Sequence, residues 1–266
     1  MPSTGGPRIY AIGDVHGCLD DLNEMLARID ADLAAHPHGD ARLVFIGDYV
    51  DRGPNSRGVI DRLLELEAGP WNTTFLKGNH DERFARYLAQ PEDRATSKYH
   101  WLSDPIGGGK TLESYGVTGS TSQDPLATHA PALAAVPAAH RAFLDRLKLT
   151  ERVGDYLFVH AGIRPGVALE DQVEHDLIWI REEFLTDTRD HGMVVVFGHT
   201  FMPQITATTN WIGIDTGCVF EGVLSCLVLE DEARWDLLPK GRAEIEIEPH
   251  PTKRPERALF SRLLRS

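Results

Sequence analysis

Three short segments decide the fold of this chain: Gly13-Asp14-Val15-His16-Gly17, Gly47-Asp48-Tyr49-Val50-Asp51-Arg52-Gly53 and Gly78-Asn79-His80-Asp81. Each follows a short apolar run, at residues 9–12, 43–46 and 74–76, and each is followed by a helical pattern. The pattern predicts three strand–loop–helix units in an α/β fold, with polar side chains at the carboxyl ends of the strands. Ligands of open α/β sheets bind there. Oxygen and imidazole donors without cysteine suit divalent metals such as manganese, iron or zinc.

The helices are predicted from the spacing of apolar residues. The first has Leu22, Met25, Leu26 and Ile29 on one side. The second starts at the capping pair Asn55-Ser56 and ends at Gly69-Pro70, and the third runs over residues 82–88 until Pro91 stops it.

Residues 91–150 differ in composition, since Pro, Gly, Ser and Thr are frequent and no strong strand signal occurs. One helix is predicted over residues 138–149. We interpret this region as a mostly helical insertion over the active site, where it shapes a substrate pocket or serves packing alone. Strands are again predicted at 156–159, 193–197, 211–214 and 223–229, with one more at 234–238. Two of these strands lead into His160-Ala161-Gly162 and Gly198-His199-Thr200.

Composition places the chain among soluble globular proteins, because 42% of its 266 residues are hydrophobic and 25% are charged. We interpret residues 1–266 as a single domain. The net charge of -13 argues against binding to nucleic acid. No apolar run approaches the roughly 20 residues of a membrane helix. Residues 1–7 lack the basic start and apolar stretch of a secretory signal, so we expect a cytoplasmic protein.

The cysteines and the C-terminal tail carry weaker signals. Cys18, Cys218 and Cys226 lack metal-ligand spacing, and we expect buried free thiols. The tail, residues 249–266, is basic, with five basic residues and one acid from Lys253 onward. Its apolar residues predict an amphipathic end docked on its own domain, with a membrane or partner anchor as the alternative.

Taken together, GDVHG, GDYVDRG and GNHD, followed by HAG and GHT, resemble the signature of the phosphoprotein phosphatase (PPP) family, bacterial type, within the calcineurin-like metallophosphoesterases. The motifs occur in the family's order over roughly residues 8–200. The resemblance implies a central β-sandwich of two mixed sheets flanked by helices. It also implies two divalent metal ions, with Mn²⁺ favoured and Fe or Zn as alternatives.

The resemblance also implies a role for each motif residue. Asp14 and His16 would hold the first metal, and Asp48 would bridge both. The second metal would be completed by Asn79, His160 and His199. Two such metals, about 3.5–4 Å apart, share a water and lower its pKa.

In the same family His80 would donate a proton to the leaving oxygen, oriented by Asp51, although a buried structural histidine is the competing interpretation. Arg52 would bind a phosphate oxygen. A second arginine is expected from the later half of the chain. Arg181 is the candidate, with a solvated helix arginine as the alternative and Arg164 in reserve.

These roles predict direct attack of a dimetal-bridging hydroxide on a phosphomonoester. We expect phosphoserine or phosphothreonine in proteins to be the substrate, and small phosphoesters as well. The alternative is a symmetrical dinucleoside tetraphosphate hydrolase, a family that is similar in the same loops. Retention of Asp51-Arg52-Gly53 favours the monoester. A metal-binding scaffold without catalysis is disfavoured, because all six ligands and His80 are present.

Other patterns are set aside. Residues 107–111, Gly-Gly-Gly-Lys-Thr, resemble the end of a P-loop, but Asp104 stands where that motif needs glycine and no strand precedes it. We interpret the neighbourhood of Trp101 as part of a substrate pocket. Asp215 is interpreted as a turn former.

Overall fold

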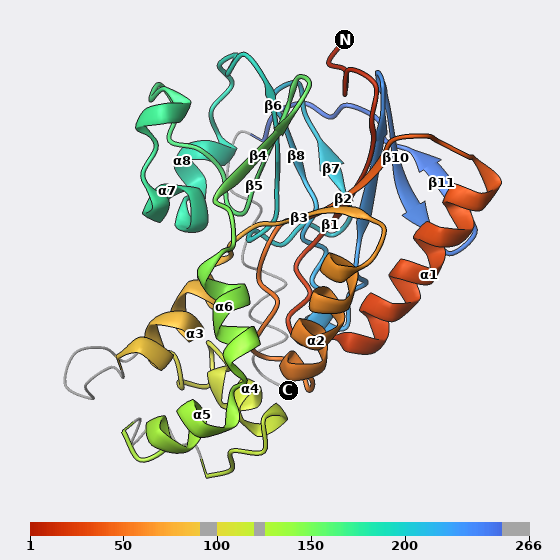
Figure 1. Cartoon of the computed structure of the whole chain (residues 1–266). Coiled ribbons are helices and arrows are strands. Elements are labelled where there is room, and N and C mark those ends of the chain that lie inside the picture. Colours follow the sequence, from red (N-terminus) through yellow and green to blue (C-terminus); the bar gives the residue numbers. More distant parts are fainter. Residues whose placement is uncertain (91–99, 120–125, 252–266) are drawn as a thin grey trace.

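The computed structural model describes residues 1–90, 100–119 and 126–251, and in these residues two β-sheets pack face to face (Figure 1). The strands are β1 (Arg8–Ile12), β2 (Ala41–Phe45), β3 (Asn72–Phe75), β4 (Thr150–Val153), β5 (Tyr156–Val159), β6 (Val194–Phe197), β7 (Thr206–Ala207), β8 (Trp211–Gly213), β9 (Cys226–Glu230), β10 (Ala233–Leu238) and β11 (Gly241–Glu244). The helices are α1 (Leu19–Ala35), α2 (Ser56–Ala68), α3 (Asn79–Ala89), α4 (Gly108–Ser114), α5 (His129–Ala135), α6 (Ala138–Asp145), α7 (Glu174–Trp179) and α8 (Glu182–Leu185), with 3₁₀ turns η1 (Leu169–Asp171) and η2 (Cys218–Phe220).

Both sheets are mixed. The six-stranded sheet has the order β11-β10-β9-β1-β2-β3, with β1, β2 and β3 parallel and the rest antiparallel. The five-stranded sheet has the order β4-β5-β6-β8-β7, in which β5, β6 and β8 are parallel. The parallel strands β1, β2, β3, β5 and β6 end in the motif loops above, and β8 ends in the loop that carries Asp215. The expected sandwich of two mixed sheets is therefore confirmed.

The side chains of β1 point alternately to the two faces of its sheet, and this alternation explains how the layers pack. Ile9 and Ala11 face the core between the two sheets, whereas Tyr10 and Ile12 face the core beneath α1 and α2. All of these side chains are fully buried, as expected for a parallel strand covered on both faces. Helices α7 and α8 cover the other sheet. The result is a four-layer arrangement with the loops of both sheets at one end.

Several predicted boundaries shift in the structure. Asn55 caps α2, since its side chain accepts a hydrogen bond from the backbone N–H of Gly58, as predicted. Helix α3 begins at Asn79 rather than Glu82, because the Asp81 carboxylate accepts from the backbone N–H of Gly78 and closes the first turn earlier. Helix α6 ends at Asp145 rather than at residue 149 because residues 150–153 pair with β5.

The segment interpreted as an insertion forms α4, α5 and α6 in its described parts. Figure 1 shows these helices gathered with α3 at one end of the sheets. Residues 91–99 and 120–125 lie outside the described residues. Most of the basic tail, residues 252–266, lies outside them as well, so its predicted docking is not tested.

The edge of the six-stranded sheet is fastened by a buried ionic network. The Asp32 carboxylate on α1 accepts hydrogen bonds from Arg242 on β11, at 2.8 and 2.7 Å, and from the Tyr10 hydroxyl at 2.6 Å. Burial opposes the charge of Asp32, but these donors outweigh it and hold its pKa below the ordinary value. The network joins the last described strand to the first helix.

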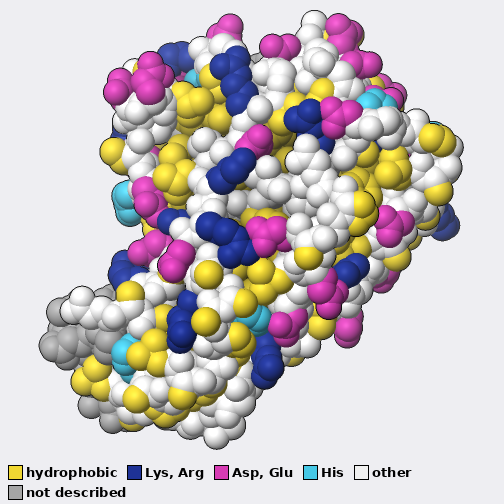
Figure 2. All heavy atoms as spheres, in the orientation of Figure 1, with side chains coloured by type: hydrophobic (Ala, Val, Ile, Leu, Met, Phe, Trp, Pro, Cys, Tyr) yellow, Lys and Arg dark blue, Asp and Glu magenta, His cyan; other side chains and the backbone are white. Residues whose placement is uncertain are grey.

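The surface charges are interspersed. On the face shown in Figure 2, Asp and Glu side chains lie beside several of the Lys and Arg side chains. Pairs such as Lys148–Glu151 and Arg146–Glu67 have this character. None of the described helices has the length and apolar composition that crossing a membrane requires.

Candidate metal centre

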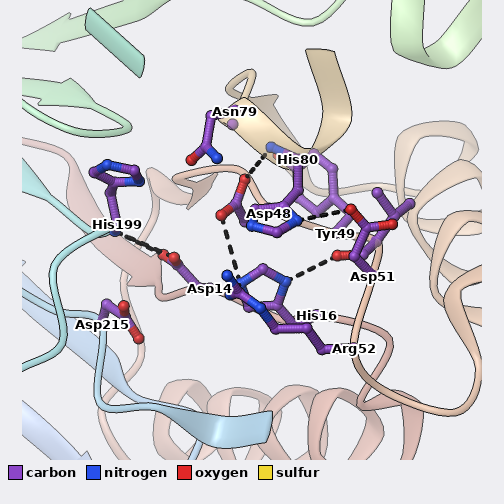
Figure 3. A network of polar contacts seen from close by, with 12 residues as sticks. Asp14, His16, Asp48, Tyr49, Asp51, Arg52, Asn79, His80, His199 and Asp215 are labelled. Atoms are coloured by element: carbon purple, nitrogen blue, oxygen red, sulfur yellow. Dashed lines mark hydrogen bonds and ion pairs between the residues drawn. The ribbon is translucent and has the colours of Figure 1, made fainter. Parts of the chain in front are cut away.

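Six predicted ligands meet where the two sheets present the carboxyl ends of their parallel strands. Asp14, Asp48 and Asn79 follow β1, β2 and β3 of one sheet, and His160 and His199 follow β5 and β6 of the other. Their side chains and that of His16 are buried. Figure 3 shows Asp14 and Asp48 between His199 on one side and His16 on the other.

Asp48 is central. Its Oδ2 lies 3.5 Å from His16 Nε2, and its Oδ1 lies 3.4 Å from His160 Nε2. The amide oxygen of Asn79 lies 3.0 Å from the same His160 nitrogen. The two oxygens of Asp48 thus face different histidines, which is the geometry that a bridging carboxylate needs.

The histidines present unsubstituted Nε2 atoms to this centre. His16 Nδ1 lies 2.8 Å from the carbonyl oxygen of Val50, and His160 Nδ1 lies 2.9 Å from that of Ile46. Since a carbonyl only accepts, Nδ1–H donates in both cases, and Nε2 is the ring nitrogen that faces the cluster. His199 Nε2 is buried and has no hydrogen-bond partner among the described residues.

This donor set fits divalent metals. Donor atoms of His16, Asp48 and His80 lie within 4.8 Å of one another, as do those of Asp48, His160 and His199, and Asp48 belongs to both groups. Carboxylate and imidazole donors accept Mn²⁺, Fe²⁺ or Zn²⁺. Asp14 lies outside both groups, where its carboxylate accepts from the backbone N–H of His199 at 3.1 Å. The assignment of each residue to a metal stays a prediction.

The buried aspartates and histidines of the cluster lie close together and shift one another's pKa. Burial, together with Asp215 and Asp48, raises the pKa of Asp14. Burial also opposes the charge of Asp48, but His160, His80 and His16 together outweigh it and hold the pKa of that carboxyl low. Asp48 in turn raises the pKa of His160 to about 9 against the effect of burial. Buried carboxylates of this kind are stabilised by cations.

The loops are held in an uncommon backbone conformation. Among the described residues, seven other than glycine have positive φ, and five of these are predicted site residues: His16 (44°), Asp48 (55°), Asp51 (74°), Arg52 (68°) and His199 (60°). The left-handed region costs free energy for residues with a Cβ, and it concentrates at functional sites. The backbone therefore stores strain at this centre.

Two glycines permit the close approach of carboxylates. A Cβ at Gly78 would overlap the Asp48 side chain, and a Cβ at Gly198 would overlap that of Asp14. The φ of Gly78 is -92°, which any residue adopts. The reason for glycine is space rather than backbone freedom.

Asp81 belongs to the third motif, but the sequence analysis gives it no role, and the structure shows it supporting the motif loops. Its carboxylate accepts from the backbone N–H groups of Asp48, Tyr49 and Gly78 at 2.8, 2.9 and 2.9 Å. It therefore ties the second motif loop to the third and supports the left-handed conformation of Asp48. Asp81 is the last residue of the GNHD motif, and this position was the sign of its role in the sequence.

His80 and Asp51 form a buried pair beside the cluster. His80 Nδ1 lies 2.7 Å from Asp51 Oδ2. Asp51 is held in turn by Trp101, whose Nε1–H donates to both carboxylate oxygens at 3.0 and 2.9 Å, and by the Thr111 hydroxyl at 2.7 Å. Burial raises the pKa of Asp51, and burial and Arg52 lower that of His80.

The glycine-rich stretch at 107–109 explains how Trp101 reaches this pair. A Cβ at Gly107 would overlap Arg52, and a Cβ at Gly108 would overlap the Trp101 ring. The carbonyl of Gly107 accepts from the backbone N–H of Arg52 at 3.3 Å. This stretch thus closes over the second motif loop, which gives the neighbourhood of Trp101 a supporting position behind Asp51.

The predicted arginines divide into two kinds. Arg52 Nη1 lies 2.6 Å from His16 Nε2, and Arg181 Nη1 donates to the carbonyl oxygen of His199 at 2.8 Å. Both therefore border the cluster. Arg164, the reserve candidate, instead pairs with Asp176 and Glu183 on the surface.

Asp215 accepts a hydrogen bond within a turn and also acts electrostatically on Asp14. Its Oδ1 accepts from the backbone N–H of Gly217 at 2.9 Å, as a turn-forming aspartate does. It also lies close enough to raise the pKa of Asp14 and is drawn beside it in Figure 3. The interpretation as a turn former is incomplete, because the residue also contributes charge to the centre.

The family described as calcineurin-like phosphoesterase matches residues 7–219. The chain belongs to the calcineurin-like phosphoesterases. It is 28% identical to an asymmetrical bis(5'-nucleosyl)-tetraphosphatase, PrpE, of Halalkalibacterium halodurans, over 81% of this chain and 87% of the relative. It is also 28% identical to a symmetrical bis(5'-nucleosyl)-tetraphosphatase of Janthinobacterium sp., over 84% and 93% of the two chains.

The fold of this phosphoesterase is also similar to a solved structure of different specificity. A cold-active protein-tyrosine phosphatase of a psychrophilic Shewanella species aligns with a TM-score of 0.60 at 15% identity, over 91% of this chain and 81% of that one. At this identity the similarity concerns the fold alone. The expected metallophosphoesterase fold and hydrolase class are therefore confirmed.

Proposed function

We propose that this phosphoesterase hydrolyses bis(5'-nucleosyl) tetraphosphates and that proteins phosphorylated on serine or threonine are not its principal substrate. The observation that carries the proposal is the similarity to tetraphosphatases over 81% and 84% of the chain. The residues Asp51-Arg52-Gly53 favour a protein phosphatase, but they form one short loop. The similarity to tetraphosphatases extends over most of the chain and therefore carries more weight. The alternative of the sequence analysis therefore becomes the leading function.

The placement of the arginines supports a chain of phosphates. Arg52 contacts His16 and Arg181 contacts His199, and these two histidines lie on opposite sides of Asp14 and Asp48 in Figure 3. A guanidinium group binds phosphate oxygens through two parallel hydrogen bonds. Separate cations on two sides suit successive phosphates of one chain better than a single phosphoryl group.

In this proposal Asp14, His16 and Asp48 would hold one divalent metal, and Asp48, Asn79, His160 and His199 would hold the second, manganese being the metal we propose. When bound, the metals lower the pKa of a water molecule and neutralise charge on phosphoryl oxygens. Arg52 and Arg181 hold the phosphates where negative charge develops.

Asp51 accepts the Nδ1–H of His80, and in the doubly protonated imidazolium the Nε2–H would be the proton given to the leaving oxygen. Serine and threonine leave as alkoxides, which need a proton. A nucleoside phosphate leaves as an anion that is stable at neutral pH. We therefore propose that His80 contributes less to tetraphosphate hydrolysis than to hydrolysis of an alkyl phosphate.

The test compares kcat/KM for diadenosine tetraphosphate with that for a phosphothreonine peptide, with Mn²⁺ supplied. We expect the dinucleotide to be preferred, and the products to show the cleavage position: two nucleoside diphosphates for symmetrical cleavage, a monophosphate and a triphosphate for asymmetrical cleavage. Asp48→Asn should abolish both activities, and exposed Asp145→Asn should retain them. A preference for the peptide would refute the proposal.

A further inference from the structure

A second group of metal-donor side chains lies beside the candidate metal centre and shares no residue with it. Cys18 precedes α1, Asp21 lies in the first turn of that helix, and Cys218 begins η2. Their two Sγ atoms and a carboxylate oxygen all lie within 4.8 Å of one another. The sequence analysis expects buried free thiols, because the cysteines lack metal-ligand spacing; all three are free in the structure, with Cys18 and Cys226 buried and Cys218 half-buried.

Both cysteines lie on backbone that is already fixed. The Cys18 N–H donates to the carbonyl of Val15, and its carbonyl accepts from Leu22, each at 3.0 Å. Gly217, directly before Cys218, has a φ of 71°, and its carbonyl accepts from the N–H groups of Phe220 and Gly222 at 2.8 and 3.1 Å. The Cys18 thiol donates to the carbonyl oxygen of His16 at 3.7 Å. Their proximity is therefore built into the loops.

The spacing is close to that of a tetrahedral site. With Zn–S bonds of about 2.3 Å, two sulfur ligands of one zinc ion lie about 3.8 Å apart. The observed limit of 4.8 Å exceeds this value by no more than about 1 Å, which side-chain rotation supplies. Asp21 is exposed, so the carboxylate side is open to solvent and leaves a fourth position for water.

The donors differ in chemistry from those of the main centre. Thiolates are soft ligands that favour zinc over manganese or magnesium, whereas the main centre offers only oxygen and imidazole nitrogen. We propose that Cys18, Asp21 and Cys218 form a separate site for a thiophilic divalent cation such as Zn²⁺. This proposal does not depend on the substrate proposed above.

A cation there would connect two parts of the active-site region. It would join the start of α1 to η2, and η2 carries Phe220, whose ring lies 5.3 Å from the Arg52 guanidinium carbon. Filling the site would thus fix the aromatic surface against which Arg52 packs.

Cobalt(II) is the probe, because a thiolate-to-cobalt charge-transfer absorption arises only from sulfur ligands and is silent for the main centre. The reduced, Mn²⁺-loaded protein should develop this absorption, saturating at one cobalt per chain, and Zn²⁺ should abolish it. Cys18→Ser and Cys218→Ser should each lose the absorption and Asp21→Asn should bind cobalt more weakly. Cys226→Ser, which removes the cysteine on β9, should match the wild type.

A second measurement avoids substitutions. Zn²⁺ should protect Cys18 and Cys218 of the wild-type protein from alkylation by iodoacetamide, as located by mass spectrometry. Absence of the charge-transfer absorption in the wild type, or its survival in either serine variant, would overturn the proposal. So would loss of both thiols to a disulfide in place of metal binding, because the pair would then be a redox element.

Discussion

Trp101→Phe examines how the Asp51–His80 pair is held. Trp101 is buried and stacks on Phe84 with ring centroids 5.1 Å apart, and phenylalanine retains part of this packing. The substitution removes part of the ring together with the N–H that donates to both oxygens of Asp51. A hydrogen bond to a charged group contributes about 1.5–3 kcal/mol. If this loss is expressed fully in a step that needs His80, the rate falls roughly 10- to 150-fold.

The assay compares kcat/KM for p-nitrophenyl phosphate, which has a good leaving group, with that for an alkyl phosphate, which has a poor one. We expect the larger loss on the alkyl phosphate, because only that leaving group needs the proton. In the Asp51→Asn background Trp101→Phe should add little, since its partner is already altered. Trp235→Phe, on β10, is the matched control. Equal losses on both substrates, or additive losses with Asp51→Asn, would refute the reasoning.

Four further results are expected. Asp48→Asn should lose bound metal, measured by elemental analysis, together with hydrolysis, and a variant with the wild-type rate would exclude a bridging role. His80→Asn should keep the metal and lose about 10²–10⁴-fold on alkyl phosphates but less on the tetraphosphate. Gly78→Ala should lower both metal affinity and the midpoint of thermal unfolding, because the added methyl group meets the Asp48 carboxylate. Asp32→Asn should lower the free energy of unfolding by about 1.5–3 kcal/mol at neutral pH. Because the folded pKa of Asp32 is depressed, this difference should be present above its unfolded pKa and disappear as the pH falls through the folded value in denaturant titrations.

The sequence predicts the fold through local rules that hold almost everywhere. Strands β1, β2 and β3 follow from short apolar runs, and α1 and α2 from apolar residues at helical spacing. The start of α3 could not be predicted from spacing alone, because it is set by the contact of the Asp81 carboxylate with Gly78. Strand β4 was missed because its pattern is mostly polar, and its place is decided by pairing with β5.

In the candidate site, too, some features follow from local sequence and others from contacts between distant segments. Motif letters predict which side chains meet around Asp48, since chain order and sheet edge place them together. Motifs do not predict contacts between distant segments. The contact of Trp101 with Asp51 and the proximity of Cys218 to Cys18 both depend on how separate segments pack. Substrate choice could not be predicted from Asp51, because this buried carboxylate bonds to His80, Trp101 and Thr111 within the protein.

The left-handed backbone of the motif loops has a practical consequence for mutagenesis. At His16, Asp48, Asp51, Arg52 and His199 a replacement changes conformational preference as well as chemistry. Asparagine tolerates this conformation, whereas valine or isoleucine opposes it through the branched Cβ. An inactive valine variant at any of these positions would confound a distorted loop with a missing functional group. Asparagine variants separate the two, and a library designed on this region should be weighted towards asparagine and glycine.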